Sequence, residues 1–378
     1  MDTGSTMTEL TPATTQEIAE ALKSAQATGK RIELRGAGSK ARMGGPISDA
    51  EMRVSMTGLH GVLQYEPKDL TISVQAGMRW KELTELLARE RQMVPLDPAC
   101  AAAATVGGVV LTNSAGPRRR LYGTARDMVI GMTYVTMDGA VAQSGGMVVK
   151  NVAGLDVQKA LIGSFGTLAA VAVINFRVAP VPESTRTFVQ SFKTAAGAVS
   201  ARDRILSSPL QPAALDVLNP AAARGCGLED WSVALRAGGG PALLGRYQNE
   251  LGGARVFEGA PEAALWAAIE EFAPGQRYVV KAGHPLAALG AVMESEADRV
   301  VSRAATGVTY LGFDSREGVE RHLRATAASG WSQVVEWSEH DLGEYWPNAG
   351  IDLEWMKKLK ASLDAGLLLN RGRLYGRI

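Results

Sequence analysis

The residues best suited to hold an anion lie in one short segment, residues 35–45, which reads RGAGSKARMGG and contains four glycines and three cations. Glycine tolerates positive φ, so residues 36–39 can turn sharply and point successive backbone N–H groups into one concavity that suits a phosphate. Lys40 and Arg42 add positive charge nearby. Taken alone, the segment is also typical of an ordinary glycine turn.

Three further glycine-rich segments follow along the chain, at residues 104–124, 144–156 and 162–171. A single glycine turn needs no ligand, whereas four glycine-rich segments indicate a long ligand. The chain has no GxxxxGK[ST]. It also has no GxGxxG that follows a strand and opens a helix, with an acidic residue about twenty positions later. The sequence therefore predicts neither a P-loop nor a Rossmann dinucleotide site.

Few residues are candidates for direct catalysis. The four histidines form no HxH, HxxH or HxxxH pair, so no two-histidine metal site on a single element is predicted. Glu336 and His340 have helical i,i+4 spacing, which we interpret as a surface pair. Cys226, in the sequence GCG, is interpreted as a small turn residue rather than a nucleophile. The basic run PRRRLYG, from Pro117, could bind a substrate carboxylate through its arginines, or form a solvated loop or a subunit contact.

Helices and strands must position these segments, and the first half of the chain predicts both. The sequence TTQE predicts an N-cap at Thr14, and apolar residues at helical spacing predict a helix over residues 15–28 that leads into the strand RIELR. LTISVQAG alternates apolar and polar residues as a half-buried strand does, and a helix is expected after GMRW. Residues 121–180 are dense in strand patterns, with a hairpin at MDG.

The proline-rich segment APVPEST, residues 179–185, indicates a domain boundary. Beyond it, FVQSFKT and SVALRAGG predict strands, and APEAALWAAIEEFA and REGVERHLRATAASG predict amphipathic helices. LEWMKKLKASLDAG predicts a last helix with Gly366 at its C-terminal cap, before the tail LNRGRLYGRI. We therefore expect mixed α and β structure.

Composition narrows the expected partners and location. With 378 residues, 46% of them hydrophobic, the chain can build a substantial core and two domains. Its net charge of +1 gives no global field for nucleic acid or an anionic membrane. Two cysteines, Cys100 and Cys226, cannot ligate an iron–sulfur cluster. Without a signal-peptide pattern or a bilayer-spanning stretch, we expect a cytoplasmic protein, peripheral at the inner face of the cell membrane only through partners.

Several long motifs occur in an order that resembles a known family. Residues 12–182 are similar to the FAD-binding domain of the vanillyl-alcohol oxidase type, also called PCMH-type. Within that group the chain resembles the E subunit, an FAD-binding subunit, of bacterial glycolate oxidase, through EPKDLTISVQAGMRWKELTELL, VPLDP, TVGGVVLTNSAGPRRRLYGTARDMVIG, GGMVVKNVAGLDVQKALIGSFGTLA and LNRGRLYGRI. The resemblance implies an α+β fold with a two-subdomain PCMH-type FAD-binding domain at 1–182, a smaller α+β cap-like domain at 183–352, and a C-terminal helix and tail, 353–378, that return to the FAD domain.

The resemblance also implies which residues bind FAD. In this family the first glycine loop and a later GG segment enclose the pyrophosphate, the TNSAG and YGT segments approach the flavin ring and ribityl chain, and a last segment closes over the adenine and diphosphate side. The matching positions, group by group, are Gly36, Ala37, Gly38, Ser39, Lys40, Thr105, Val106, Gly107 and Gly108; Asn113, Ser114, Gly116, Gly123 and Thr124; and Gly163, Ser164, Gly166, Thr167 and Leu168.

The chain departs from the family pattern at three positions. KNVAGLD, residues 150–156, has Leu155 where the flavin-proximal KNVAGYD run has tyrosine, and LNRGR has Arg371 where LNPGR has proline. Members that attach FAD covalently often use a histidine just after the first glycine loop, where this chain has Ser39. The resemblance therefore implies a dissociable, non-covalent FAD.

The implied activity is oxidation of glycolate to glyoxylate. This chain would bind FAD and pass electrons to a partner subunit or acceptor, in a complex with a second FAD-containing catalytic subunit and an iron–sulfur subunit. Two alternatives stay open: a stand-alone FAD-dependent dehydrogenase of a small 2-hydroxy acid, and a redox-silent scaffold with an FAD-type fold. Related dehydrogenases carry an HxxxxNxH motif in the cap domain, which this sequence lacks, so no catalytic residue is assigned.

Overall fold

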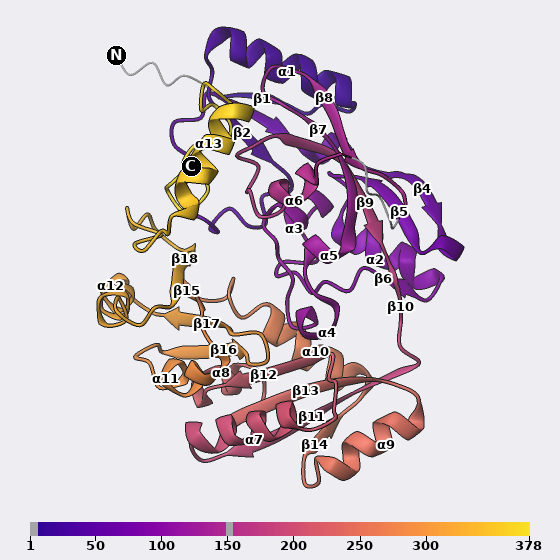
Figure 1. Cartoon of the computed structure of the whole chain (residues 1–378), viewed down its shortest axis with the longest axis vertical. Coiled ribbons are helices and arrows are strands. Elements are labelled where there is room, and N and C mark those ends of the chain that lie inside the picture. The colour runs from indigo at the N-terminus through magenta and orange to yellow at the C-terminus, as the bar shows by residue number, and fades with distance from the viewer. Residues whose placement is uncertain (1–6, 149–153) are drawn as a thin grey trace.

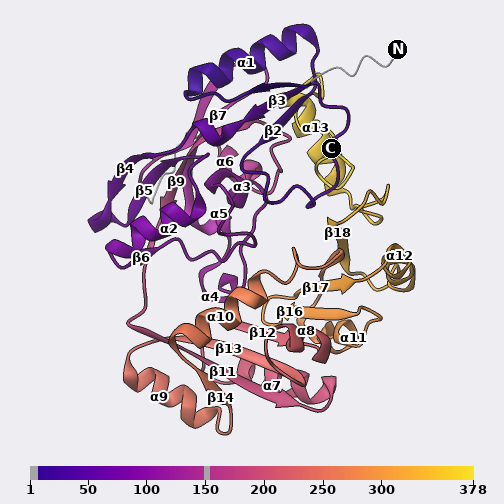
Figure 2. The same ribbon diagram turned by 180° about the vertical axis from the view of Figure 1, so that it is seen from behind.

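The computed structural model describes residues 7–148 and 154–378, which form two bodies stacked along the long axis of the molecule (Figure 1). The first body contains sheets of three, five and two strands, and the second contains one sheet of eight. Seen from behind, the last helix and the tail lie beside the first body (Figure 2). Part of the KNVAGLD run, residues 150–153, lies outside the described residues.

The first body opens with a helix against a small parallel sheet. The helix α1 (Thr15–Thr28) begins after Thr14, whose Oγ1 accepts a hydrogen bond from the Glu17 backbone N–H at 3.1 Å, and ends at Gly29 in the left-handed region. These bounds confirm the predicted helix. The sheet has the order β1-β3-β2 and is formed by β1 (Thr8–Leu10), β3 (Met52–Ser55) and β2 (Ile32–Arg35).

An antiparallel sheet of order β4-β5-β9-β7-β8 forms the rest of the first body. The predicted hairpin at MDG is confirmed, because the Thr136 N–H donates to the Ala140 carbonyl across a turn in which Gly139 has a φ of 81°. The predicted helix after GMRW is α2, which buries Leu83 and Leu87 against the sheet. The elements are β4 (Val62–Glu66), β5 (Thr71–Gln75), α2 (Trp80–Arg89), α3 (Val106–Leu111), α4 (Arg119–Tyr122), α5 (Ala125–Met128), β7 (Val129–Val135), β8 (Val141–Gly145), α6 (Val157–Leu161) and β9 (Ala170–Arg177).

The chain passes to the second body within the proline-rich segment. β10 (Ala179–Pro180) still pairs with β6 (Gln92–Met93) of the first body, and β11 (Ser184–Phe192) already belongs to the eight-stranded sheet. A division after residue 182 is consistent with this change of sheet. The domain limits 1–182, 183–352 and 353–378 stay our proposal.

The second body is an antiparallel sheet covered on both faces. Along β13, Val233, Leu235 and Ala237 pack into one hydrophobic cluster and Ala234 into the other, as the period of two requires. The outer face carries α7 (Ala195–Ser207), α9 (Pro241–Glu250), α11 (Leu289–Met293) and α12 (Arg316–Ala325). The face toward the first body is covered by α8 (Pro220–Gly225) and α10 (Gly259–Glu270). The predicted strands and helices of this half are confirmed as β11, β13, α10 and α12.

The sheet order of the second body is β14-β11-β13-β12-β16-β17-β15-β18. The elements after β11 are α7 (Ala195–Ser207), β12 (Ala214–Leu218), α8 (Pro220–Gly225), β13 (Trp231–Gly239), α9 (Pro241–Glu250), β14 (Arg255–Phe257), α10 (Gly259–Glu270), β15 (Tyr278–Gly283), α11 (Leu289–Met293), β16 (Arg299–Arg303), β17 (Val308–Phe313), α12 (Arg316–Ala325) and β18 (Ser332–Ser338).

The last helix, α13 (Asp352–Leu363), leads into a tail that returns to the first body. Here "the tail" means residues 364–378. The Ile32 N–H donates to the Leu368 carbonyl at 2.8 Å, and the Asn370 N–H donates to the Ile32 carbonyl at 2.9 Å, so the tail runs along β2. Among the described residues, no helix combines the length and the apolar character needed to cross a bilayer.

Candidate functional site

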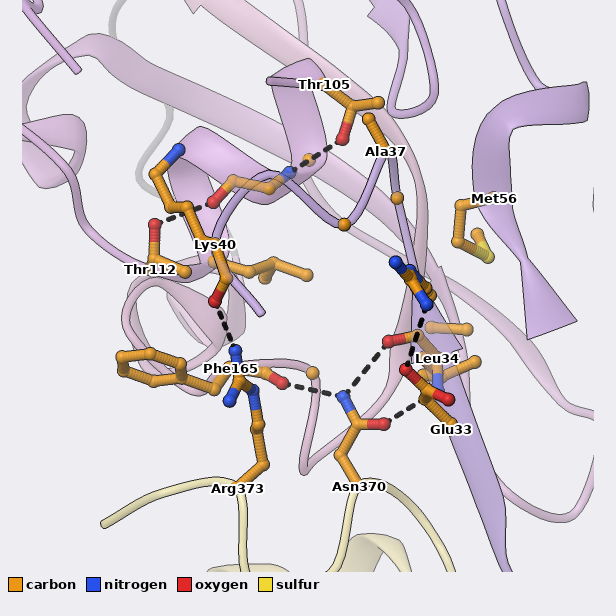
Figure 3. A pocket seen from close by; sticks show the side chains of 18 of the residues that line it. Glu33, Leu34, Ala37, Lys40, Met56, Thr105, Thr112, Phe165, Asn370 and Arg373 are labelled. Atoms are coloured by element: carbon orange, nitrogen blue, oxygen red, sulfur yellow. Dashed lines mark hydrogen bonds and ion pairs between the residues drawn. The ribbon is translucent and has the colours of Figure 1, made fainter. Parts of the chain in front are cut away.

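A cavity of about 440 Å³ opens in the first body where β2, α3, the turn around Phe165 and the tail meet (Figure 3). Its volume lies in the range of small-molecule and cofactor sites, which is roughly 300 to 1,000 Å³. The sequence-predicted residues that line it are Gly36, Ala37, Gly38, Ser39, Lys40, Thr105, Gly107, Gly108 and Gly166. The fold therefore brings together the first glycine loop, the GG segment and part of the last predicted segment.

The glycine loop, residues 36–40, touches the start of α3. Thr105 caps α3, because its Oγ1 accepts the Gly108 N–H at 3.2 Å, and a Cβ at Gly36 would overlap that same hydroxyl. Gly38 has a φ of 73°, and a Cβ there would overlap the Arg35 guanidinium. Gly36 is thus required by its close approach to the Thr105 side chain at the start of α3, and Gly38 by its positive φ.

The tail closes the far side of the cavity with two side chains. Arg373 donates from Nη1 to the Ala41 carbonyl at 3.0 Å and to the Gly45 carbonyl, and from Nη2 to the Lys40 carbonyl at 2.5 Å. Burial lowers the pKa of Arg373 to about 10. The guanidinium therefore fixes the residues that follow the glycine loop.

Asn370 joins the tail to two other walls of the cavity. Its Oδ1 accepts the Leu34 N–H at 2.7 Å and its Nδ2 donates to the Phe165 carbonyl at 2.8 Å, as Figure 3 shows. Neither Asn370 nor Arg373 is among the predicted cofactor-binding residues. Both residues belong to the LNRGR motif, which the resemblance places in a tail that returns to the FAD domain. This motif was the sequence feature that could have indicated their place in the site.

Lys40 stands out among the residues that line the cavity. Its side chain is 6% exposed, and among the described residues its Nζ has no hydrogen-bond partner. Burial lowers its pKa to about 8, although Cys100 and Glu271 act in the opposite direction. A buried amine without a partner is costly, so this group suits an anionic ligand.

A second, much smaller cavity of about 30 Å³ lies between the two bodies, and Asn113, Ser114 and Gly116 line it. Asn113 has a φ of 48°, and among the described residues its Oδ1 has no partner. A Cβ at Gly116 would overlap the Asp97 backbone, so this segment also needs a glycine. Three of the five predicted ring-proximal residues, Asn113, Ser114 and Gly116, therefore face the second body rather than the large cavity.

Charged side chains surround the small cavity in opposite pairs. Arg118 donates to Asp97 at 2.7 Å, Lys281 to Glu336 at 2.6 Å, and Arg303 to Asp216. Burial, and then the charge of Asp97, raise the pKa of Glu270, which also lines this cavity, to about 8.

The pairing corrects one interpretation of the sequence. Glu336 is 3% exposed and pairs with Lys281, so the interpretation of Glu336 and His340 as a surface pair is wrong. The helical spacing is also not realised, because Glu336 lies in strand β18 and its partner Lys281 lies in the neighbouring strand β15. In the basic run, Arg118 is held by Asp97 and Arg120 donates to Gln211 at 3.0 Å.

The remaining predicted residues line neither cavity. Val106 is in the hydrophobic core. Gly123 and Thr124 lead into α5, where the Thr124 N–H donates to Asp127 at 2.8 Å. Gly163, Ser164, Thr167 and Leu168 surround the turn that presents Phe165 and Gly166; within it, the Thr167 hydroxyl donates to the Ser164 carbonyl at 2.7 Å. Their assignment to FAD stays a prediction.

No group of three or more histidine, cysteine or acidic side chains placed to hold a metal ion is found in the described parts of the chain. His322 is buried and its Nε2 lies 2.9 Å from Gln333 Oε1, and His284 Nε2 lies 2.8 Å from Thr309 Oγ1. Both contacts are within the second body, away from the large cavity.

Comparison with known proteins identifies the ligand class. Residues 9–157 match the family model described as FAD binding domain. Over 171 residues the chain is 32% identical to glycolate oxidase subunit GlcE of Escherichia coli strain K12, covering 45% of this chain and 48% of that protein. Over 210 residues it is 28% identical to glycolate oxidase subunit GlcD of Bacillus subtilis strain 168, covering 56% of this chain and 45% of that protein. The chain thus spans about half the length of these curated relatives.

Other similar proteins include a D-2-hydroxyglutarate dehydrogenase of Xanthomonas citri pv. viticola, 31% identical over 172 residues, which are 45% of this chain and 36% of that protein. Among solved structures, 4-ethylphenol oxidase from Gulosibacter chungangensis superimposes with a TM-score of 0.74 at 14% identity, covering 97% of this chain and 88% of that one. An alkyldihydroxyacetonephosphate synthase superimposes with a TM-score of 0.70 at 16% identity, covering 96% of this chain and 75% of that one.

These findings confirm the α+β, PCMH-type FAD-binding fold and FAD as the cofactor. The relatives named above include two glycolate oxidase subunits and a D-2-hydroxyglutarate dehydrogenase. The cavity fits this cofactor, because its glycine loop packs closely on Thr105 and its lining includes the Lys40 amine, which has no hydrogen-bond partner among the described residues. Both features suit a long ligand with an anionic centre.

Proposed function

We propose that this chain is the E-type, FAD-binding subunit of a glycolate oxidase, and that it takes part in the oxidation of glycolate to glyoxylate by passing electrons to a partner subunit. The observation that carries the proposal is the large cavity, in which the glycine loop, the start of α3 and the tail meet. The likeness to GlcE supports the subunit assignment. FAD would be bound without a covalent bond, because Ser39 occupies the position where covalent relatives often have histidine.

In this proposal the glycine loop, Thr105, Gly107, Gly108 and Gly166 hold the FAD diphosphate through backbone N–H groups. Asn113, Ser114 and Gly116 lie beside the flavin ring and ribityl chain, facing the second body. The other predicted residues, Val106, Gly123, Thr124, Gly163, Ser164, Thr167 and Leu168, would shape these segments. When bound, FAD accepts a hydride equivalent from an alcohol carbon and releases the electrons to an acceptor.

The electrons need an exit, and this chain does not supply a metal cluster for it. Its two cysteines, Cys100 and Cys226, are too few to ligate an iron–sulfur centre. We therefore include in the proposal a second FAD-containing catalytic subunit and an iron–sulfur subunit as partners. Both cysteines are free thiols, which suits a complex that works in the reducing cytoplasm or at the inner face of the cell membrane.

A second candidate, a stand-alone 2-hydroxy acid dehydrogenase, is favoured by the charged residues around the small cavity. Glu270, with a pKa of about 8, has the properties of a general base, and Arg303 and Lys281 are suited to a carboxylate. Against it, both cations already pair with carboxylates, and about 30 Å³ holds roughly one water molecule.

Turnover by the purified chain separates these functions. The chain is reconstituted with FAD and given glycolate and a dye acceptor, alone and then with its two partner subunits. We expect a yellow protein that reduces the dye with glycolate only when the partners are present. Turnover by the chain alone would establish the stand-alone dehydrogenase. A chain that binds no FAD, alone or in the complex, would establish the redox-silent scaffold.

A further inference from the structure

We propose that the Lys40 amine is the counter-ion of the FAD diphosphate, and that FAD binding draws a proton onto it. This rests on the proposed binding of FAD in the large cavity. Binding of FAD would then depend on pH through this one side chain.

The other cations that line the cavity are already engaged. Arg373 donates its guanidinium to three backbone carbonyls, at the last residue of the glycine loop and in the segment that follows it. Arg35 lies within 3.9 Å of Glu33, and Glu33 also accepts from Arg53 at 2.8 Å. Lys40, by contrast, is buried and its Nζ has no partner within the described parts of the chain.

Burying an amine without a partner opposes folding unless something compensates. The acidic side chain on the same cavity, Glu33, lies on the opposite side of it from Lys40 (Figure 3) and is bonded elsewhere. Glu271 and Cys100 act on the charge of Lys40, but neither lines the cavity, and no described residue bonds to the Lys40 Nζ. A bonded counter-ion would therefore come from the ligand, and FAD carries its two negative charges on the diphosphate.

Position favours the diphosphate over the rest of the cofactor. Lys40 lies two residues after the bend at Gly38, and the same loop touches Thr105 at the start of α3. Its main chain is fixed at the carbonyl, which accepts from the Met43 N–H at 3.0 Å and from Arg373. A phosphate held by the loop amides would thus lie within reach of an amine whose backbone cannot move away.

The charges around Lys40 set the direction of the pH effect. Burial lowers its pKa to about 8, while Cys100 and Glu271, the titratable groups that face it, raise it. Glu271 also accepts the Cys100 N–H at 2.7 Å, and Arg42 lies near Cys100. Arg35, Glu33 and Arg373 are the other charged residues that line the cavity. Two phosphate charges nearby favour the protonated amine, so its pKa rises when FAD binds.

The linkage then has a definite sign. Below a pH of about 8 the free protein already carries the proton, and binding takes up none. Above it, binding takes up a proton, and the affinity for FAD falls with pH by up to about tenfold per unit until the higher pKa of the complex is passed.

Titration calorimetry of the FAD-free full chain measures this directly. FAD is injected at about pH 9, in two buffers of different ionisation enthalpy, so that the heat difference counts the protons taken up. The chains are the wild type, Lys40→Arg, Lys40→Gln and Lys81→Gln, the last being an exposed lysine on α2. ADP and riboflavin are used in place of FAD to separate the diphosphate from the flavin. Thermal unfolding of each FAD-free chain checks folding.

We expect the wild type and Lys81→Gln to take up a proton with FAD and with ADP, but none with riboflavin. Lys40→Arg should bind FAD without proton uptake, because arginine stays charged. Lys40→Gln should bind FAD and ADP about 10- to 100-fold more weakly, because that is the expected contribution of a hydrogen bond to a charged group. It should take up no proton on binding.

Two results would overturn the inference while leaving FAD binding intact. One is the absence of proton uptake by a wild type that binds FAD. The other is a folded Lys40→Gln chain with the wild-type affinity for FAD and ADP. A wild type that binds no FAD under any condition would instead overturn the proposed function on which the inference rests.

Discussion

Arg373 shows how one side chain can organise a binding loop through bonds to its backbone carbonyls. It spans three carbonyls, those of Lys40, Ala41 and Gly45, and so fixes the chain directly after the glycine loop. We predict that Arg373→Met weakens FAD binding at least about tenfold and lowers the free energy of unfolding by about 1–3 kcal/mol, because buried acceptors lose their donors.

The exposed Arg371, two positions earlier, provides the matched control. Arg371→Met should leave both the FAD dissociation constant and the chemical denaturation curve close to wild type. Equal effects of the two substitutions would show that loss of charge in the tail, rather than the bonds of Arg373, matters.

Among single residues, the sequence predicted those whose role depends only on the local backbone conformation. Gly36 and Gly38 could be singled out because a sharp bend needs glycine wherever it occurs. Arg373 and Asn370 could not be assigned to the cavity, since their bonds cross more than 300 residues. The burial of Lys40 also depends on segments distant in sequence. Its charge was therefore predictable, whereas the lack of a hydrogen-bond partner for its Nζ among the described residues was not.

At the scale of elements, α13 is fastened to the first body by a buried ion pair. Lys360 Nζ donates to Asp364 Oδ2 at 2.6 Å and also to the carbonyls of Thr167 and Leu369. Both charged side chains are almost fully buried. The pair therefore joins the last helix, the tail and the turn after Gly166.

We predict that Lys360→Met destabilises the protein by about 3–5 kcal/mol, because it leaves a buried carboxylate without its cation. The midpoint of thermal unfolding measures the loss. Lys357→Met, on the exposed side of the same helix, should shift that midpoint little. A small effect of both would show that α13 is not anchored through Lys360.

Individual helices and hairpins were predictable from periodicity and caps, as α1, α2 and the MDG hairpin show. The order of the eight-stranded sheet was not, because β12 pairs with β16 and β15 with both β17 and β18. Such pairings depend on tertiary packing rather than on the pattern within each strand.

At the scale of the whole molecule, the segment after the glycine loop also joins the two bodies. Arg42 Nη2 donates to the carbonyls of Gln276 and Arg277, at 2.6 and 2.8 Å, and the Gly44 N–H donates to the Glu336 carbonyl at 2.9 Å. The cofactor loop, the tail and the second body are thus one connected structure. No sequence motif indicated the charged cavity that forms between the bodies.

Glu270 makes that interface sensitive to pH. Burial, then Asp97, raise its pKa to about 8, above the ordinary 4.5, so the folded protein favours the protonated acid. The associated stability is complete below a pH of about 4.5 and is lost as the pH rises through about 8. We predict that Glu270→Gln raises the midpoint of thermal unfolding at about pH 8 and flattens its fall between about pH 5 and 8.

Thermal unfolding across this pH range checks the prediction, with the exposed Glu317→Gln as control. The control should follow the wild-type curve. If Glu270→Gln followed it as well, the carboxyl group would not be the source of the pH dependence.

The claim on which the whole account depends is that the glycine loop and α3 hold FAD in the large cavity. Its most direct test is a fluorescence titration of the FAD-free chain with FAD, for the wild type, Gly36→Ala and Gly225→Ala, where Gly225 has open space around its Cα. We predict that the wild type and Gly225→Ala bind one FAD that is released on denaturation, and that Gly36→Ala binds at least about tenfold more weakly because its methyl group displaces Thr105. Wild-type affinity in a folded Gly36→Ala chain would contradict the account.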